Sequence, residues 1–139
     1  MRISKIAILA SLAGGVALSA PALLEPAFAV QDQPMTMGGI EAVCTGVGSA
    51  KDNPAWGGYP IKLVFANRAG ENLAQVHVAL KQRGKTVLET DCDAPWLLLK
   101  AKGDFAVTAM VGARVGNASF SSNGSGPQKE ITVTLPPAK

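Results

Sequence analysis

The residues that could carry acid–base or nucleophilic chemistry are few and scattered along the chain. His77 is the single histidine, and a hydrolytic triad would have to pair it with a serine such as Ser119 or Ser121. Neither serine lies in a G-x-S-x-G sequence, the sharp turn that exposes a nucleophilic hydroxyl. His77 also lies between Val76 and Val78, so alternation places it on the polar face of a strand. The sequence therefore predicts no catalytic residue, and a hydrolase around His77 is the least favoured alternative.

Residue types that bind metals are present, but not at the spacing of a known kind of site. Asp91, Asp93 and Asp104 lie near two turns, where their carboxylates could converge on calcium. They lack the regular acidic spacing of an EF-hand loop. Zinc is also disfavoured, because one histidine and two distant cysteines without C-x-x-C make a poor ligand set. We therefore expect turn-capping aspartates, and neither a metal nor a cofactor.

Three aromatic side chains are the candidates for contacts with a ligand or partner. Trp56 and Tyr59 lie in a glycine-rich stretch, and Trp96 follows Pro95 in a turn. Exposed aromatic rings stack on sugars or anchor partner proteins. The alternative is structural: Trp56 and Tyr59 fold back over the end of the domain, and Trp96 closes that end. The sequence leaves both interpretations open.

The first residues have the pattern of a signal peptide. Two basic residues in the first five positions precede an uncharged apolar run over 6–20, and Ala27 and Ala29 supply small residues for cleavage after Ala29. A membrane anchor would need roughly 20 unbroken apolar residues, whereas a proline and Glu25 interrupt the run. We therefore expect a periplasmic or secreted protein that has no membrane span after cleavage.

Export gives a role to the two cysteines, Cys44 and Cys92. In an oxidising compartment an even cysteine count favours a disulfide, and a redox or metal pair lacks the C-x-x-C spacing. The bond would close a loop of about 50 residues, which is worth roughly 4 kcal/mol in the chain-entropy model. We therefore predict a structural Cys44–Cys92 disulfide.

Composition limits the kind of protein further. The chain has 139 residues, of which 47% are hydrophobic and 17% charged, so it is long enough for one domain with a genuine core. Fifteen glycines and nine prolines favour turns and short strands over a helical bundle. The formal net charge is +3 without a Lys/Arg cluster, so a nucleic-acid partner is not expected.

The pattern of apolar residues predicts short strands joined by turns. Apolar and polar residues alternate over 61–66, 75–81, 105–111 and 130–135, and residues 83–85 read as a tight hairpin. Residues 86–90 and 96–99 add further strands, 112–119 a weak edge strand, and 102–104 and 121–127 a turn and a loop. Residues 30–37 are expected to be poorly ordered. Phe105, Val107 and Ala109 are expected to pack against Val76, Val78 and Leu80 of the opposite sheet.

Together these segments predict an all-β fold of six or seven strands. We expect a single Ig-like Greek-key sandwich, with an open barrel as the alternative. The organisation expected is a signal peptide over 1–29 (the signal helix), an N-terminal segment and loop over 30–59, and a sandwich domain over 60–139. The disulfide would tether the N-terminal segment to the sandwich.

Half of the mature chain also resembles a known family. The residues that carry the resemblance are 59–66 (YPIKLVFA), 73–78 (LAQVHV), 84–88 (GKTVL), 93–99 (DAPWLLL) and 103–109 (GDFAVTA). They are similar to exported bacterial proteins with a carboxypeptidase regulatory-like domain, which is transthyretin-like and prealbumin-type. Ala94 stands where that family usually has glycine, and 100–102 replace an apolar turn with a proline. The resemblance implies a prealbumin-type sandwich and, because such scaffolds serve many roles, little about function.

These observations favour a binding protein over an enzyme. We expect a non-enzymatic periplasmic β-sandwich that binds or braces another cell-envelope protein. The alternative is a carbohydrate-binding module that contacts a glycan through Trp56, Tyr59 or Trp96.

Overall fold

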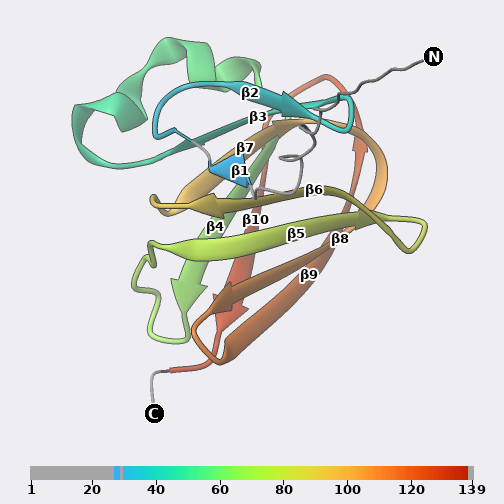
Figure 1. Ribbon diagram of the computed structural model, residues 1–139. Helices are drawn as coiled ribbons and strands as arrows, with labels where there is room; N and C mark the ends of the chain where they lie inside the picture. Colours follow the sequence, from blue (N-terminus) through green and yellow to red (C-terminus); the bar gives the residue numbers. More distant parts are fainter. Residues whose placement is uncertain (1–26, 29, 138–139) are drawn as a thin grey trace, which may run out of the picture.

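The protein consists of two five-stranded β-sheets packed face to face (Figure 1). The computed structural model describes residues 27–28 and 30–137. Sheet A has the order β1 (Ala27–Phe28), β6 (Lys85–Cys92), β5 (Val76–Gln82), β8 (Lys102–Val111), β9 (Arg114–Asn123). Sheet B has the order β10 (Lys129–Leu135), β4 (Ile61–Asn67), β7 (Trp96–Lys100), β3 (Ile40–Thr45), β2 (Met35–Met37). Of the expected signal peptide, residues 1–26 and 29 lie outside the described residues, and residues 27–28 form β1.

The all-β, Ig-like sandwich predicted from the sequence is confirmed. The described residues hold no α-helix, and most neighbouring strands are antiparallel. Two parallel pairs lie at sheet edges, β10 on β4 and β1 on β6. The sheets hold more strands than the six or seven expected. The surplus comes mainly from the N-terminal part of the chain, where apolar runs are too short for periodicity to separate strand from turn.

The core lies between the sheets and is built from the inward-facing residue of each alternating pair. Val78, Leu80 and Val107 of sheet A are fully buried there against Leu63 and Phe65 of sheet B. The expectation that 76–80 and 105–109 belong to opposite sheets is wrong. Their strands are neighbours in sheet A, with Leu80 opposite Val107. Alternation identifies which face of a strand is buried, but it does not identify the strand that packs against it.

The disulfide predicted from the sequence is confirmed, and it joins the two sheets. Cys44 of β3 and Cys92 of β6 have their Cα atoms 5.7 Å apart, and both side chains are fully buried. β3 itself lies between β7 and β2. The sandwich therefore includes residues of the 30–59 segment that the sequence assigned to a tethered extension.

The expectation that residues 30–37 are poorly ordered is also wrong. The backbone N–H of Asp32 donates to the carbonyl of Cys44 at 2.7 Å, and the Thr45 hydroxyl donates to the Asp32 carboxylate at 2.6 Å. Residues 35–37 then pair with β3. Backbone pairing and the buried Thr45 hydroxyl provide hydrogen-bond partners for polar groups of this segment. Its polar composition therefore does not prevent a fixed conformation.

One predicted turn is confirmed and another is wrong. Arg83 and Gly84 both have positive φ, 55° and 81°, as a two-residue hairpin between β5 and β6 requires. By contrast, 102–104 form the start of β8, which pairs with β9 as far as Asn123. The chain passes from sheet B to sheet A through Ala101 alone. Glycine at 103 therefore lies inside a strand rather than in a turn.

Candidate functional site

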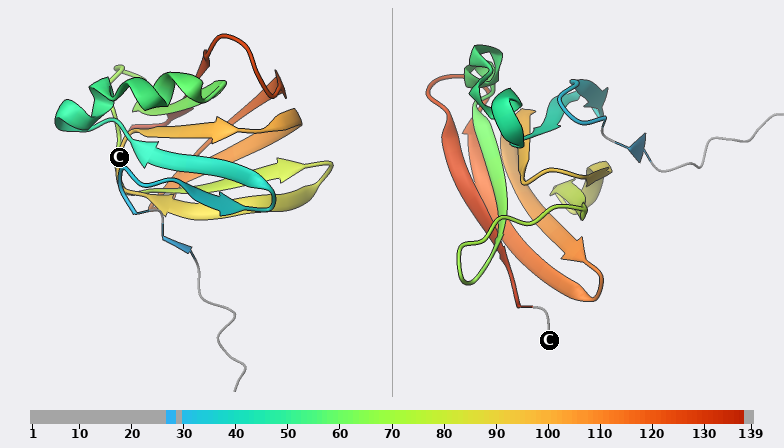
Figure 2. Two further views of the ribbon diagram at one scale, coloured as in Figure 1. Left: turned by 90° about the horizontal axis from the view of Figure 1, so that it is seen from above. Right: turned by 90° about the vertical axis from the view of Figure 1, so that its left-hand side faces the viewer.

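The stretch that carries Trp56 and Tyr59 forms a cover over the outer face of sheet B. It contains two short 3₁₀ turns, η1 (Gly48–Asp52) and η2 (Pro54–Gly58), which lie on the side of sheet B away from β5 and β6 (Figure 2). Asn53 caps the start of the second turn, and its side chain accepts from the Ala55 N–H at 2.9 Å. We call residues 46–59 the covering segment.

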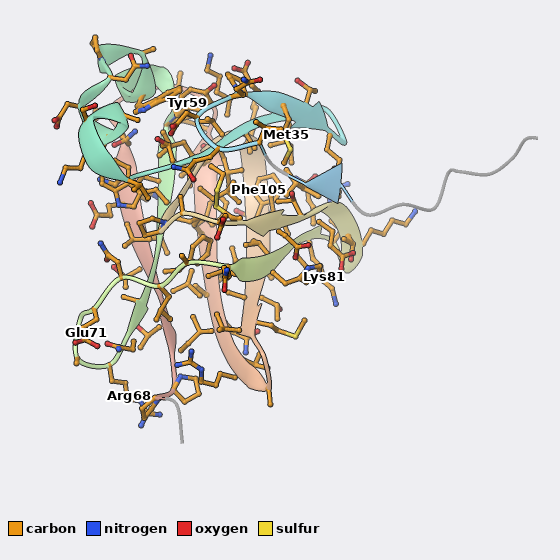
Figure 3. The ribbon with its side chains drawn as sticks, turned by 60° about the vertical axis from the view of Figure 1, so that its left-hand side comes forward. Met35, Tyr59, Arg68, Glu71, Lys81 and Phe105 are labelled. Carbon is orange, nitrogen blue, oxygen red and sulfur yellow. A yellow bond between two sulfur atoms is a disulfide. The ribbon has the colours of Figure 1, made fainter. Side chains whose placement is uncertain are left out.

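Trp56 and Tyr59 are the residues of this covering segment that are buried against sheet B, with exposed fractions of 8% and 3%. Their rings contact each other edge to face, with centroids 6.1 Å apart, and pack on Val43 and Leu98, the outward residues of β3 and β7. Figure 3 shows Tyr59 beside the 3₁₀ turns, whereas Phe105 lies between the sheets. A second small core therefore exists on the outer face of sheet B.

The polar ends of both rings are also bonded within the protein. The Trp56 indole N–H donates to the Ala50 carbonyl at 2.7 Å, and the Tyr59 hydroxyl donates to the Glu41 carboxylate at 2.6 Å. Burial, reinforced by that carboxylate, raises the pKa of Tyr59 well above its ordinary value. The Lys100 ammonium lies 4.8 Å from the Tyr59 ring. Neither ring is free to stack on a ligand or to hydrogen-bond with it.

Trp96 is half-buried, and its ring also contacts other residues of the protein. The Lys62 ammonium lies 3.6 Å from the ring centroid. Gly46, with a φ of 113°, packs so closely that a Cβ there would lie 2.8 Å from ring atoms.

The interpretation of Trp56 and Tyr59 as exposed contacts is therefore wrong. The structural alternative holds, although the cover lies on the face of sheet B and not at the end of the sandwich.

A cluster of charged side chains lies on the outer face of sheet A, around His77. Its Nδ1 is 2.7 Å from the Asp91 carboxylate, and its Nε2 is 2.6 Å from the Glu89 carboxylate. Both acids come from β6, the hairpin partner of β5. Only the imidazolium has an N–H on each nitrogen for two carboxylates. The hydrogen bond to Asp91, and then the one to Glu89, raises the pKa of His77.

The other two aspartates singled out in the sequence lie apart from this cluster. Asp104 lies elsewhere on the same sheet, where its carboxylate accepts from the Ser121 hydroxyl at 2.5 Å. Asp93 occupies an exposed turn. Within residues 27–28 and 30–137, no three or more His, Cys, Asp or Glu side chains are placed to hold a metal ion. The three aspartates singled out in the sequence are thus not brought together.

The His77 cluster predicts a pH dependence of stability. Because folding raises the pKa of His77 above 6.5, the cluster stabilises the fold fully below about pH 6.5 and loses this effect as pH rises through the folded pKa. Since the imidazole is half-exposed, we expect a modest fall in the urea midpoint over that range. The variant His77→Gln should flatten the profile. NMR titration of the single imidazole gives the folded pKa, and a value at or below 6.5 would contradict the assignment.

Comparison with known proteins adds no assignment to this geometry. Among the described residues, none belongs to a helix of the length and apolar character needed to cross a membrane. No model of a known protein family matches the chain, and no curated protein matches it. The similarity of residues 59–109 to carboxypeptidase regulatory-like domains therefore stays a prediction.

Proposed function

We propose that this protein works outside the cytoplasm as a non-enzymatic β-sandwich that binds or braces another cell-envelope protein. The observation that carries the proposal is the uncovered outer face of sheet A. Met110 and Val115 lie opposite each other in neighbouring strands there, with 37% and 43% of their surfaces exposed. Contiguous exposed apolar side chains are typical of interaction surfaces.

The two outer faces of the sandwich differ in a way that supports this assignment. Residues 46–59 cover much of sheet B, whereas the described chain leaves the face of sheet A open to solvent. Between the apolar pair and Lys81 the open face carries short side chains. These are Ala79, Ala106, Thr108, Asn117 and Ser119. Because no large side chain protrudes from the middle of this surface, another flat surface can approach it closely.

The chemistry of the molecule favours binding over catalysis and favours an oxidising compartment. The His77 imidazole has both nitrogens bonded to carboxylates, so no free nitrogen is left to activate a nucleophile. A buried disulfide that joins the sheets fits a periplasmic or secreted protein. The glycan alternative loses support, because Trp56 and Tyr59 are buried and hydrogen-bonded, and the half-buried Trp96 ring is in contact with the Lys62 ammonium.

Site-specific photo-crosslinking in living cells tests the proposal. A photoreactive amino acid at Val115 should give one discrete adduct, whereas the same group at Thr132, exposed on the outer face of sheet B, should give none. Introducing Ala106→Arg in the middle of the same face, where Ala106 lies opposite Ser119, should abolish the adduct, because a long charged side chain would hold a flat partner away. An adduct that survives Ala106→Arg, or equal adducts at both positions, would contradict the assigned surface.

A further inference from the structure

Two open pockets lie side by side at one end of the sandwich. Register places the β2–β3 turn, the β5–β6 hairpin, the β7–β8 passage and the β9–β10 loop at this end, away from the β8–β9 hairpin (Figure 1). Arg68 and Glu71 lie at the opposite end (Figure 3). The pockets have volumes of about 400 Å³ and about 450 Å³, and Asn123 lines both of them. The two pockets therefore adjoin at Asn123, and we call the surface that they line the lysine end.

All charged side chains that line the two pockets are lysines. Lys129 lines the first pocket, and Lys100 and Lys102 line the second. Lys100 lies 3.7 Å from Glu41, and the Lys129 ammonium donates to the Ser121 carbonyl at 2.9 Å. Among the described residues no ion pair involves Lys102. The second pocket thus presents an unneutralised ammonium group to solvent.

The hairpin next to the pockets adds to this positive charge. Arg83 lies at its tip, Lys85 is the first residue of β6, and both are exposed. The formal net charge of the whole chain is only +3, so gathering several cations at one end makes that end locally positive. Lysine ammonium groups attract carboxylates as point charges, without requiring a fixed planar geometry.

The walls of the two pockets differ, and this difference indicates the kind of ligand. The first pocket has apolar walls from Pro60 and Pro127, beside serine hydroxyls. The second offers lysines together with the side-chain amides of Gln82 and Asn123. A peptide can place an apolar side chain in one pocket and a carboxylate in the next. An acidic glycan has no apolar side chain to offer, and no exposed tryptophan or tyrosine lines these pockets for its rings.

We propose that the lysine end binds an extended acidic segment of a partner protein. An apolar side chain of that segment contacts Pro60 and Pro127, and the aspartate or glutamate beside it contacts Lys102 and Lys100. This surface is separate from the open face of sheet A. The inference goes beyond the proposed function, and either can fail without the other.

Fluorescence anisotropy with a synthetic peptide tests the inference directly. The probe is a short labelled peptide that alternates leucine and glutamate, compared with a version in which lysine replaces glutamate. We expect saturable binding of the acidic peptide alone, weakened by salt. Lys102→Glu should weaken binding about fivefold to tenfold. Lys51→Glu, which makes the same change in net charge on η1, should change the dissociation constant less than about twofold.

A second measurement locates the bound peptide. During an NMR titration the side-chain amide signals of Gln82 and Asn123 should move, whereas that of Gln33 should stay fixed. Equal weakening by Lys102→Glu and Lys51→Glu would mean diffuse electrostatic attraction and would overturn the site. No saturable binding below about 1 mM would overturn it too. Binding of a carboxylated polysaccharide that is tighter than binding of the acidic peptide, and that moves the same Gln82 and Asn123 signals, would also overturn the inference.

Discussion

Replacing Cys44 and Cys92 together by alanine is expected to lower the free energy of unfolding by about 4 kcal/mol. The two residues are 48 positions apart, so the disulfide restricts a large part of the unfolded chain. In the folded protein the bond joins β3 of sheet B to β6 of sheet A within the core. The loss is a large share of the ~5–15 kcal/mol that stabilises a small domain. Urea unfolding of the oxidised protein and the double variant measures it.

A control separates the crosslink from the volume of the sulfur atoms. The unaltered sequence, refolded and kept in reductant, retains both side chains but lacks the bond. It should lose nearly as much stability as the double variant. A difference below about 1 kcal/mol between oxidised and reduced protein would contradict the loop-closure argument. Thiols that react with an alkylating agent in protein purified without reductant would contradict the bond itself.

The features that could be predicted from the sequence depend on local pattern or on counting. Alternation over 61–66, 75–81 and 130–135 corresponds to strands β4, β5 and β10. The hairpin follows from a glycine at 84, which accepts positive φ at little cost. Pairing of the cysteines follows from their even number and the expected export. Each of these inferences needs only a short segment of the chain or a count of residues.

The features that could not be predicted depend on which surfaces meet. β3 and β7 are apolar on consecutive residues, because sheet A covers one face and the covering segment the other. Val43 and Leu98 are the outward residues concerned. The composition of 45–59 is that of a loop, and nothing local shows that its two aromatic rings fold onto sheet B. The sheet to which residues 105–111 belong could not be predicted either, since alternation does not identify a partner strand.

The His77 cluster shows how one irregularity hides a site from sequence reasoning. At the turn of the hairpin Lys81 pairs with Thr86, but the register shifts between Leu80 and Lys81. Without that bulge His77 would lie opposite Thr90, whose side chain is buried in the core. The extra residue brings Asp91 opposite His77 instead. A hairpin and an acidic partner strand were visible in the sequence, whereas the bulge that aligns them was not.

Replacing Trp56 by alanine is expected to lower the free energy of unfolding by about 3–5 kcal/mol. The ring is buried on Val43 and Leu98, and its indole N–H donates to the Ala50 carbonyl. Removing the ring uncovers two outward side chains of central strands in sheet B and deprives Tyr59 of its aromatic neighbour. Urea unfolding measures the loss.

Two further variants show whether Trp56 stabilises the covering segment or binds a ligand. Trp56→Phe keeps an aromatic ring but loses the hydrogen bond to Ala50, so it should cost about 1–3 kcal/mol. Val47→Ala alters a side chain of the same segment that is 48% exposed, and should change stability by less than about 0.5 kcal/mol. Tryptophan fluorescence across a panel of glycans completes the test. If Trp56→Ala were to cost less than about 1 kcal/mol and also abolish a glycan response, the ring would be exposed in solution. The carbohydrate-binding function would then replace the one proposed here, because a Trp56 ring that stabilises the fold this little is not buried against sheet B.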